Sequence, residues 1–346
     1  MSDVALYRKY RPKIFEEVLG QEQVVAALTH AIKNDNVGHA YIFSGGRGIG
    51  KTTIARIFAR ELGTHEQDLI EIDAASNRGI DDIRALREGV HTLPFSSPYK
   101  VYVIDEVHML TKEAWNALLK TLEEPPKHVI FMMATTEPDK IPDTILSRCQ
   151  TFTLKRPTIS AIRDMILSVA GAEGYTIEPA SADLIALLAD GAFRDAHGIL
   201  QKIIASSTGT TLTHEEVEAI TGSPQSTRLV DLLGALARQD ADEALAQVRV
   251  LTEQSNAKTV LTLLLRLVRA VLVVRSAPTF ADTIRNEYTE HEWEAIRQHA
   301  ETARKTVNSA LLARLLDAQI QTGSTYTPEL PLELAIIDLG ADKQSS

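Results

Sequence analysis

The sequence is poor in cysteine and in aromatic residues: Cys149 is its one cysteine, and Phe, Trp and Tyr together make up 5% of 346 residues. A single cysteine forms no internal disulfide and cannot build a cysteine zinc site, which excludes a disulfide-rich secreted scaffold. The longest apolar run, residues 260–274, is interrupted by Arg266 and Arg269 and is too charged to span a bilayer. The charged N-terminal residues do not resemble a signal peptide. We therefore expect a cytoplasmic protein with no membrane partner.

Basic residues are fewer than acidic ones, 36 against 46, so the formal net charge is −10. A free-standing nucleic-acid-binding protein is usually basic, and this balance argues weakly against that class. It leaves open a protein that contacts DNA through a local patch or within an assembly. The hydrophobic content of 44% and charged content of 24% are typical of a soluble globular protein, and the length allows two or three domains.

Short apolar runs alternate with longer amphipathic stretches over about the first 155 residues. The expected strands cover residues 40–43, 69–72, 101–104, 129–133 and 151–154, and the expected helices cover 23–32, 52–62, 81–90 and 114–122. Continuous apolar strands that alternate with helices predict a parallel sheet covered on both faces. We expect an α/β domain over residues 1–156.

After Pro157 no further strand is expected. Helices are predicted at 160–170, 182–189, 195–206 and 214–220, the last with Thr213 as its N-cap, and they form a small helical domain over 157–222. The turn-rich segment 221–226 marks the next boundary. A larger helical domain over 223–346 contains helices at 229–237, 241–253, 258–274, 290–302 and 309–321. Only the tail 341–346 is expected to be disordered.

A phosphate-binding loop follows the first expected strand. Residues 45–52 read Gly-Gly-Arg-Gly-Ile-Gly-Lys-Thr and match G-x-x-x-x-G-K-[ST] in full, between a strand and a helix as the motif requires. The glycines allow backbone N–H groups to surround phosphate oxygens, Lys51 would reach the β- and γ-phosphates, and the Thr52 hydroxyl would bind Mg²⁺. A chance glycine turn is the alternative. The nucleotide-contacting residues expected here are Gly45, Gly46, Arg47, Gly48, Ile49, Gly50, Lys51, Thr52 and Thr53.

Two carboxylates end the third expected strand, at Asp105 and Glu106. In this position Asp105 would lie beside the metal ion and Glu106 could polarise an attacking water. A surface Asp-Glu pair at a strand end is the alternative and is common in α/β proteins. About fifty residues after a complete phosphate-binding loop, the pair favours an active NTPase that uses ATP and Mg²⁺.

Further motifs occur in a fixed order along the chain. They are residues 10–12 (Tyr-Arg-Pro), Phe15, Val18, 20–21 (Gly-Gln), 38–41 (Gly-His-Ala-Tyr), 105–110 (Asp-Glu-Val-His-Met-Leu), 116–126 (Asn-Ala-Leu-Leu-Lys-Thr-Leu-Glu-Glu-Pro-Pro), 134–136 (Ala-Thr-Thr) and 147–149 (Ser-Arg-Cys). This set resembles the gamma/tau subunits of the bacterial DNA polymerase III clamp loader, which are AAA+ ATPases, and more distantly the small subunits of replication factor C. The resemblance is dense over residues 4 to about 200 and diffuse in the C-terminal helices.

The resemblance implies roles for residues outside the loop. An adenine-contacting strip is implied for Tyr7, Arg11, Pro12, Val18 and Leu19. Thr136 takes the sensor 1 position near the γ-phosphate. Arg148 would be an arginine finger that acts on a neighbouring subunit's nucleotide, and Arg194 a sensor 2 arginine on the helical lid. The alternatives are a surface salt bridge for Arg148 and a helix-capping contact for Arg194.

The chain departs from the family at one segment. Gamma/tau subunits usually carry a four-cysteine zinc module after the helix that follows the phosphate-binding loop, whereas residues 62–68 cross this gap with His65 alone and no cysteine. No zinc is therefore expected. The intact loop disfavours the related delta-prime subunit, whose loop is characteristically broken. We expect either a natural short form like gamma or a shortened chain.

Partner surfaces are also implied by the resemblance. Arg78 and Arg84, around the start of the helix at 81–90, would contact the backbone of primer–template DNA, although Asp81 and Asp82 would repel phosphate and a solvated helix start is the alternative. The sliding clamp would meet residues 107–115 or the helix after the first β–α unit, with core packing as the alternative for Trp115. The helices from Leu229 onward would form a collar that holds a ring.

The sequence thus predicts an ATP-driven clamp-loader subunit. In a ring with delta-type and delta-prime-type subunits and copies of itself, it would open the sliding clamp and load it onto primed DNA. One alternative is a different AAA+ motor, such as a branch-migration helicase or a helicase loader, which would need a basic winged helix. Another is a ring member that binds ATP without hydrolysing it, which the intact Glu106 and Thr136 disfavour.

Overall fold

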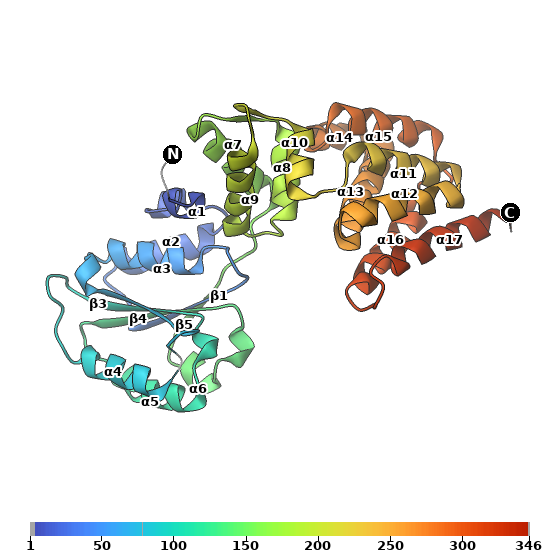
Figure 1. Cartoon of the computed structure of the whole chain (residues 1–346). Coiled ribbons are helices and arrows are strands. Elements are labelled where there is room, and N and C mark those ends of the chain that lie inside the picture. The colour runs from blue at the N-terminus through green and yellow to red at the C-terminus, as the bar shows by residue number, and fades with distance from the viewer. Residues whose placement is uncertain (1–3, 78, 345–346) are drawn as a thin grey trace. The chain divides into compact units, whose positions relative to one another are not determined.

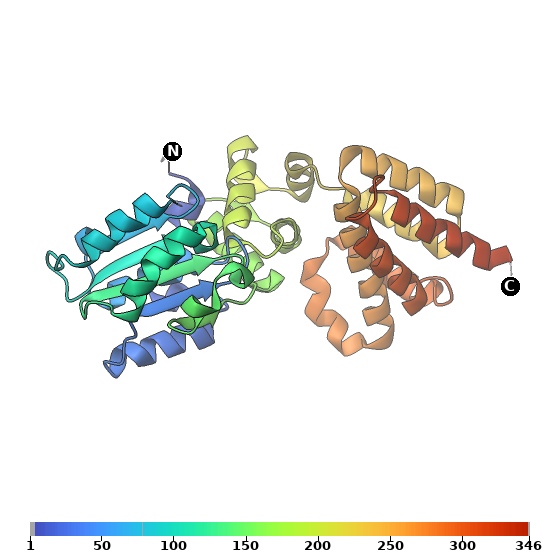
Figure 2. The same cartoon turned by 90° about the horizontal axis from the view of Figure 1, so that it is seen from below.

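The computed structural model describes residues 4–77 and 79–344, and Figures 1 and 2 show the chain from two sides. It divides into two compact units, one made of Met1–Met165 and Ala189–Gly198 and the other of Ile166–Leu188 and Ile199–Ser346. The division falls inside two helices, α7 (Ile159–Ala172) and α9 (Phe193–Ser206). Both helices lie in the part of the sequence predicted as the small helical domain.

The first unit is built on a five-stranded parallel sheet with the strand order β2-β3-β4-β1-β5. Its strands are β1 (Ala40–Ser44), β2 (Leu69–Asp73), β3 (Lys100–Asp105), β4 (Val129–Thr135) and β5 (Gln150–Thr153). All five predicted strands are confirmed, with ends that differ by no more than two residues. The α/β class with a parallel sheet is also confirmed.

Helices cover both faces of this sheet (Figure 1). The helices on one face are α2 (Glu22–Lys33) and α3 (Lys51–Glu61), and those on the other are α4 (Ile80–Val90), α5 (Lys112–Glu123) and α6 (Asp143–Leu146). Successive strand residues point to opposite faces. Tyr41 and Phe43 of β1 therefore belong to the core under α2 and α3, whereas Ile42 belongs to the core on the other face.

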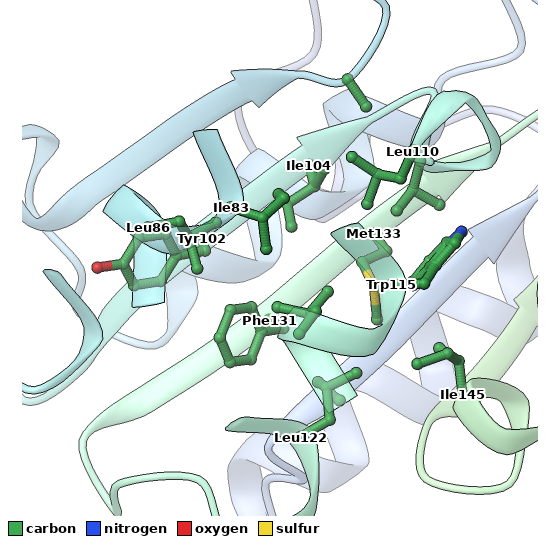
Figure 3. Close-up of a cluster of buried hydrophobic side chains, with 14 of the residues drawn as sticks. Ile83, Leu86, Tyr102, Ile104, Leu110, Trp115, Leu122, Phe131, Met133 and Ile145 are labelled. Atoms are coloured by element: carbon green, nitrogen blue, oxygen red, sulfur yellow. The ribbon is translucent and has the colours of Figure 1, made fainter. Parts of the chain in front are cut away.

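The core beneath α4 and α5 contains Tyr102, Phe131 and Met133 from the sheet and Trp115 from α5 (Figure 3). Trp115 is 4% exposed, so the core-packing interpretation of this residue is the one that the structure supports. Cys149 packs against the same cluster. Burial raises the pKa of its thiol to about 12, and the nearby Arg148 lowers it by less. The thiol behaves as a small apolar group.

Short elements complete the first unit. They are α1 (Leu6–Lys9) and four 3₁₀ helices, η1 (Phe15–Glu17), η2 (Glu66–Asp68), η3 (Val107–Met109) and η4 (Pro138–Lys140). The helix η2 lies within residues 62–68, the segment where the resemblance to gamma/tau subunits would place a zinc module. Among residues 4–77 and 79–344, no three His, Cys, Asp or Glu side chains form a group that could hold a metal ion.

The second unit is almost entirely helical. Its elements include α8 (Pro179–Leu188), α10 (His214–Thr221), α11 (Ser226–Arg238), α12 (Ala241–Gln254), α13 (Ala257–Ser276), α14 (Pro278–Ile284), η5 (Arg285–Glu287), α15 (Glu290–Thr302), α16 (Ser309–Thr322) and α17 (Leu330–Gln344). Thr213 caps α10 as predicted, because its side chain accepts the N–H of Glu216 while the Glu216 carboxylate accepts the N–H of Thr213. None of the described helices is both long and apolar enough to cross a membrane.

Three expectations for this region were wrong. Two-residue strands, β6 (Thr176–Ile177) and β7 (Thr211–Leu212), pair in parallel where no strand was predicted, and they are too short to show an alternating pattern. The helices α14 and α17 were missed. Of the tail that was expected to be disordered, residues 341–344 continue α17. Pro278 and Pro331 obscured these helices in the sequence, although proline is tolerated in a first helical turn.

Candidate nucleotide-binding site

The loop between β1 and α3 has a backbone that only glycine adopts without strain. Gly45, Gly48 and Gly50 have positive φ angles of 138°, 72° and 107°. A Cβ on Gly45 would lie 2.7 Å from Ile49 Cδ1 and 2.8 Å from the Leu154 carbonyl oxygen, closer than packed atoms come. The glycines at these positions therefore follow from the shape of the loop, which wraps the N-terminus of an eleven-residue helix. This is the arrangement that binds phosphate.

Lys51, the first residue of α3, points back into this loop. Its ammonium group donates hydrogen bonds to the carbonyl oxygens of Gly45 (2.9 Å) and Gly46 (2.7 Å), and the residue is 5% exposed. Burial lowers the pKa of Lys51, and the carboxylates of Glu106 and Asp105 oppose this shift. The structure thus holds a buried cation at the mouth of the loop, where an anionic phosphate would complement it.

Thr52 and Asp105 provide two oxygen ligands in contact with each other. The Thr52 hydroxyl donates a hydrogen bond of 2.9 Å to Asp105 Oδ2, and Oδ1 of the same carboxylate accepts the Glu106 N–H at 3.0 Å. Asp105 ends β3, and Thr52 lies in the first turn of α3. Mg²⁺ is commonly held by one or two protein oxygens together with phosphate oxygens and water. These two residues fit that requirement.

Glu106 sits at a strained position immediately after β3. Its φ angle is 48°, in the left-handed region that a non-glycine residue rarely adopts. Thr136, which follows β4, donates a hydrogen bond of 3.1 Å from its hydroxyl to Glu106 Oε2. The strand order places β3 next to β4, so the predicted base and the predicted sensor 1 residue meet at the carboxyl edge of the sheet.

Residues that the sequence analysis did not assign surround Glu106. His108 Nδ1 lies 3.5 Å from Glu106 Oε2 and 3.0 Å from the Thr135 hydroxyl, and its Nε2 lies 3.3 Å from Glu137 Oε1. His108 and Thr135 belong to the motifs at 105–110 and 134–136, so their position within those motifs was the available signal. Spacing alone does not say that the three elements meet.

The N-terminal segment contacts two elements beside the loop, the helix α3 and the start of α9. Arg11 Nε donates a hydrogen bond of 3.1 Å to the Thr53 hydroxyl of α3, and burial lowers the pKa of Arg11. The Arg194 guanidinium lies over the Tyr7 ring, 4.9 Å from its centroid, and the Arg194 N–H approaches the Gly48 carbonyl at 3.4 Å. Tyr7, Arg11 and Arg194, which are predicted site residues outside the loop, are thereby brought to one side of it.

The other members of the predicted adenine strip vary in exposure. Val18 packs against the core under α2 and α3, Pro12 is half-buried, and Leu19 is 43% exposed. Gln21, which was quoted in a motif but given no role, is 3% exposed. Its amide donates to the Lys155 carbonyl at 2.7 Å and accepts the Lys155 N–H at 3.1 Å. Gln21 therefore links the N-terminal strip to the segment that follows β5.

Arg148 is fixed at the C-terminal end of α6. Its guanidinium bonds to Glu123 Oε1 of α5 at 2.7 Å and to the Thr144 carbonyl at 2.5 Å. Among the described residues, its contacts are with α5, α6 and the adjacent Ser147, not with Lys51, Asp105 or Glu106. Within one chain, Arg148 is therefore in a surface ion pair and not in its own nucleotide site.

Of the two arginines that were expected to contact DNA, the structure describes only Arg84. Arg78 lies outside the described residues. Arg84 forms an exposed ion pair with Asp81 at 3.2 Å, and Asp82 accepts the Gly79 N–H at the start of α4. For Arg84, these contacts are those of a solvated helix start.

A cavity of about 550 Å³ lies beside the loop. Its lining includes Gly45 and Gly46 of the loop, Thr136, and the carboxylates of Asp139 and Asp143. It joins the phosphate-binding loop to the segment that carries η4 and α6.

Two protein families match this chain. The family described as "DNA polymerase III, delta subunit" matches residues 20–78 and 63–158, and the family of "DNA polymerase III subunits gamma and tau domain III" matches residues 212–344. DNA polymerase III subunit tau of Bacillus subtilis is 44% identical over 275 residues, which are 73% of this chain and 49% of that protein. Subunit tau of Escherichia coli is 40% identical over 269 residues, 72% of this chain and 42% of that protein.

The chain belongs to the gamma/tau family of DNA polymerase III subunits. It spans about half the length of the curated relatives that it matches. A solved structure of the Thermotoga maritima RuvB branch-migration motor covers 66% of the chain and 79% of RuvB, with a TM-score of 0.53 and 22% identity. At this identity the likeness concerns the AAA+ fold alone. The gamma/tau match in the C-terminal helices separates this chain from the branch-migration motors.

Proposed function

We propose that this chain is an ATPase subunit of a clamp loader, and that it hydrolyses ATP to open a sliding clamp and load it onto primed DNA. One observation carries the proposal. Behind a complete phosphate-binding loop, the Thr52–Asp105 and Thr136–Glu106 pairs meet at the carboxyl ends of neighbouring strands. In a sheet of this type, ligands bind at that edge.

The residues divide the reaction among themselves. Lys51 and the loop N–H groups hold the phosphates, and Thr136 fixes the orientation of Glu106. Glu106 accepts a proton from the attacking water as the bond to the γ-phosphorus forms and the bond to the leaving β-phosphate oxygen breaks. Mg²⁺ held by Thr52 and Asp105 would neutralise charge on the β- and γ-phosphates. Tyr7, Arg11 and Arg194 would close the site around the nucleotide.

Arg148 gives hydrolysis a dependence on assembly. Because it bonds to Glu123 and not to its own site, we propose that it acts on the nucleotide of an adjacent subunit. The partners would be delta-type and delta-prime-type subunits and further copies of this chain in a cytoplasmic ring, together with the clamp and primer–template DNA. We retain a division into an α/β domain (1–156), a lid (157–222) and a collar (223–346) as part of this proposal.

The test compares ATP binding with ATP turnover in the wild type and in Glu106→Gln. We expect the variant to bind ATP with unchanged affinity and to lose about 10²–10⁴-fold in turnover, the usual contribution of a general base. Glu124→Gln is the matched control. It removes an exposed carboxylate at the C-terminal end of α5 and should behave as the wild type. Equal turnover by wild type and Glu106→Gln would favour the ring member that binds ATP without hydrolysing it.

A further inference from the structure

We propose that His108 is a positioning residue for Glu106, acting through its Nδ1 edge; this rests on the proposed function of Glu106 as the base. His108 lies on η3, two residues after Glu106, and its side chain is 6% exposed. Its polar contacts within the described part of the chain are with residues that we do not assign to the phosphates or to Mg²⁺. Its contacts are with Glu106, Thr135 and Glu137.

Glu106 needs such support because its backbone is strained. A left-handed conformation is unfavourable for a non-glycine residue and persists only where the surrounding structure imposes it. The carboxylate is also partly exposed, at 33% of its side chain, so solvent leaves it room to change rotamer. The Thr136 hydroxyl at 3.1 Å restrains one oxygen from the side of β4, and the His108 ring edge at 3.5 Å closes the side of η3.

The imidazole ring itself is held at both nitrogens. The buried Thr135 hydroxyl lies 3.0 Å from Nδ1 and at the same time accepts the Glu137 N–H at 3.0 Å. The Glu137 carboxylate lies 3.3 Å from Nε2, and its other oxygen pairs with Lys140 at 2.8 Å. A ring fixed in this way presents an immobile edge to Glu106. The Nδ1 side faces the base, and the Nε2 side faces away from it.

Two amide substitutions separate the sides of the ring. The amide nitrogen of His108→Asn can take the place of Nδ1, and that of His108→Gln the place of Nε2. If positioning runs through the Nδ1 edge, His108→Asn keeps kcat within about 3-fold of the wild type. His108→Gln and His108→Ala then lose about 10–100-fold in kcat with KM for ATP nearly unchanged, as expected for a misplaced catalytic group.

His128→Asn is the matched control. His128 contacts the Val90 carbonyl ahead of β4, on the opposite edge of the sheet from Glu106, so its replacement tests the loss of any histidine in this unit. ATP affinity and thermal unfolding are measured for each variant, which separates a folding defect from lost positioning. The Asn and Gln variants decide the outcome even if His108→Ala folds poorly.

Equal kcat for His108→Asn and His108→Gln, whether both normal or both low, would overturn the inference. So would a raised KM with an unchanged kcat, because it would indicate a role in binding ATP. Glu106→Gln is measured in parallel. If it loses turnover while the His108 variants do not, only the inference fails; if it does not, the proposed function fails and the inference falls with it.

Discussion

At the scale of single residues, each polar group of the site is held by a residue from another element. Lys51 bonds to the loop carbonyls, Thr52 to Asp105 and Thr136 to Glu106. A side chain that is fixed before its ligand arrives loses less conformational entropy on binding. The order of the site therefore comes from pairs of residues, and the Thr52–Asp105 and Thr136–Glu106 pairs join segments that are distant in the sequence.

A substitution at Gly48 tests how closely the phosphate-binding loop approaches the start of α9. A Cβ there would lie 3.0 Å from Ala192 Cβ and 3.3 Å from Arg194 Cβ, at a φ angle of 72°. We expect Gly48→Ala to lower the free energy of unfolding by about 1–2 kcal/mol, because of the left-handed backbone and the close contact. Urea unfolding measures it. Gly46→Ala, with 3.8 Å to its nearest neighbour, should cost less, and an equal cost at both positions would contradict this explanation.

Cys149 offers a clean test because the chain has no other thiol. Its pKa of about 12 lies far above neutral pH, so the reactive thiolate is scarce in the folded protein. At pH 8 we expect a disulfide reagent to label it at least about 100-fold more slowly than a free cysteine peptide. Labelling in guanidinium should be fast. Rapid labelling of the folded protein would contradict the raised pKa of Cys149.

The residues that we propose to carry the chemistry could largely be predicted from the sequence, and those that we propose to position them could not. Lys51, Asp105 and Glu106 stand in short contiguous motifs whose chemistry is local. His108 and Gln21 act through contacts with Thr135 and Lys155, across the sheet or along it. Such contacts depend on the order of the strands in the sheet, which cannot be predicted from the spacing of residues within a short motif.

At the scale of elements, the long amphipathic helices and the apolar strands were predictable because their periodicity spans many residues. The strands β6 and β7 have two residues each and form only because they pair with one another. The helix α17 has weak periodicity, since it buries Leu332 and Ile336 but exposes Leu334 and Ile337. Tertiary packing decides such segments, and the sequence alone does not.

The Asp68 side chain links η2, to which it belongs, to the loop before β3 through hydrogen bonds. Its carboxylate accepts the backbone N–H groups of Phe95, Ser96 and Ser97. Burial opposes its ionisation, but these bonds outweigh burial and lower its pKa from 3.8 to about 2. The folded pKa lies below the unfolded one, so the stabilisation is present above pH 4 and is lost as the pH falls towards 2.

We therefore expect Asp68→Asn to lower the free energy of unfolding by about 2 kcal/mol at pH 7, with a smaller difference from the wild type below pH 4. Urea titrations at several pH values measure it. Glu66→Gln, an exposed residue of the same short helix, is the control and should change stability little. A difference that persists unchanged at pH 2 would contradict the role of the Asp68 charge.

At the scale of the whole molecule, apolar side chains remain exposed on the last helices. Leu316 and Ile320 of α16 and Leu334 and Ile337 of α17 are between 47% and 78% exposed. Apolar surface of this kind is typical of an interface with a partner. It supports a collar, whereas the net charge of −10 gives no support to a chain that binds DNA alone.

Ile320→Asp tests the collar. Because the side chain is 78% exposed, we expect the stability of the single chain to change by less than about 0.5 kcal/mol. A buried, unpaired carboxylate at an interface is costly, so assembly with the ring partners should weaken by at least about 10-fold. Sedimentation velocity measures the assembly. Asp317→Asn, on the same helix, is the control, and normal assembly by Ile320→Asp would exclude this face.

We propose above that Arg148 of one subunit completes the ATP site of the next. Steady-state ATP turnover by the ring, with and without clamp and primed DNA, tests it most directly. An arginine finger contributes roughly 10³–10⁵-fold, so Arg148→Ala should abolish the stimulated turnover while ATP binding and assembly are retained. Arg163→Ala, which removes another surface ion pair of the same unit, should leave it intact. Stimulated turnover by Arg148→Ala at the wild-type rate would contradict the account.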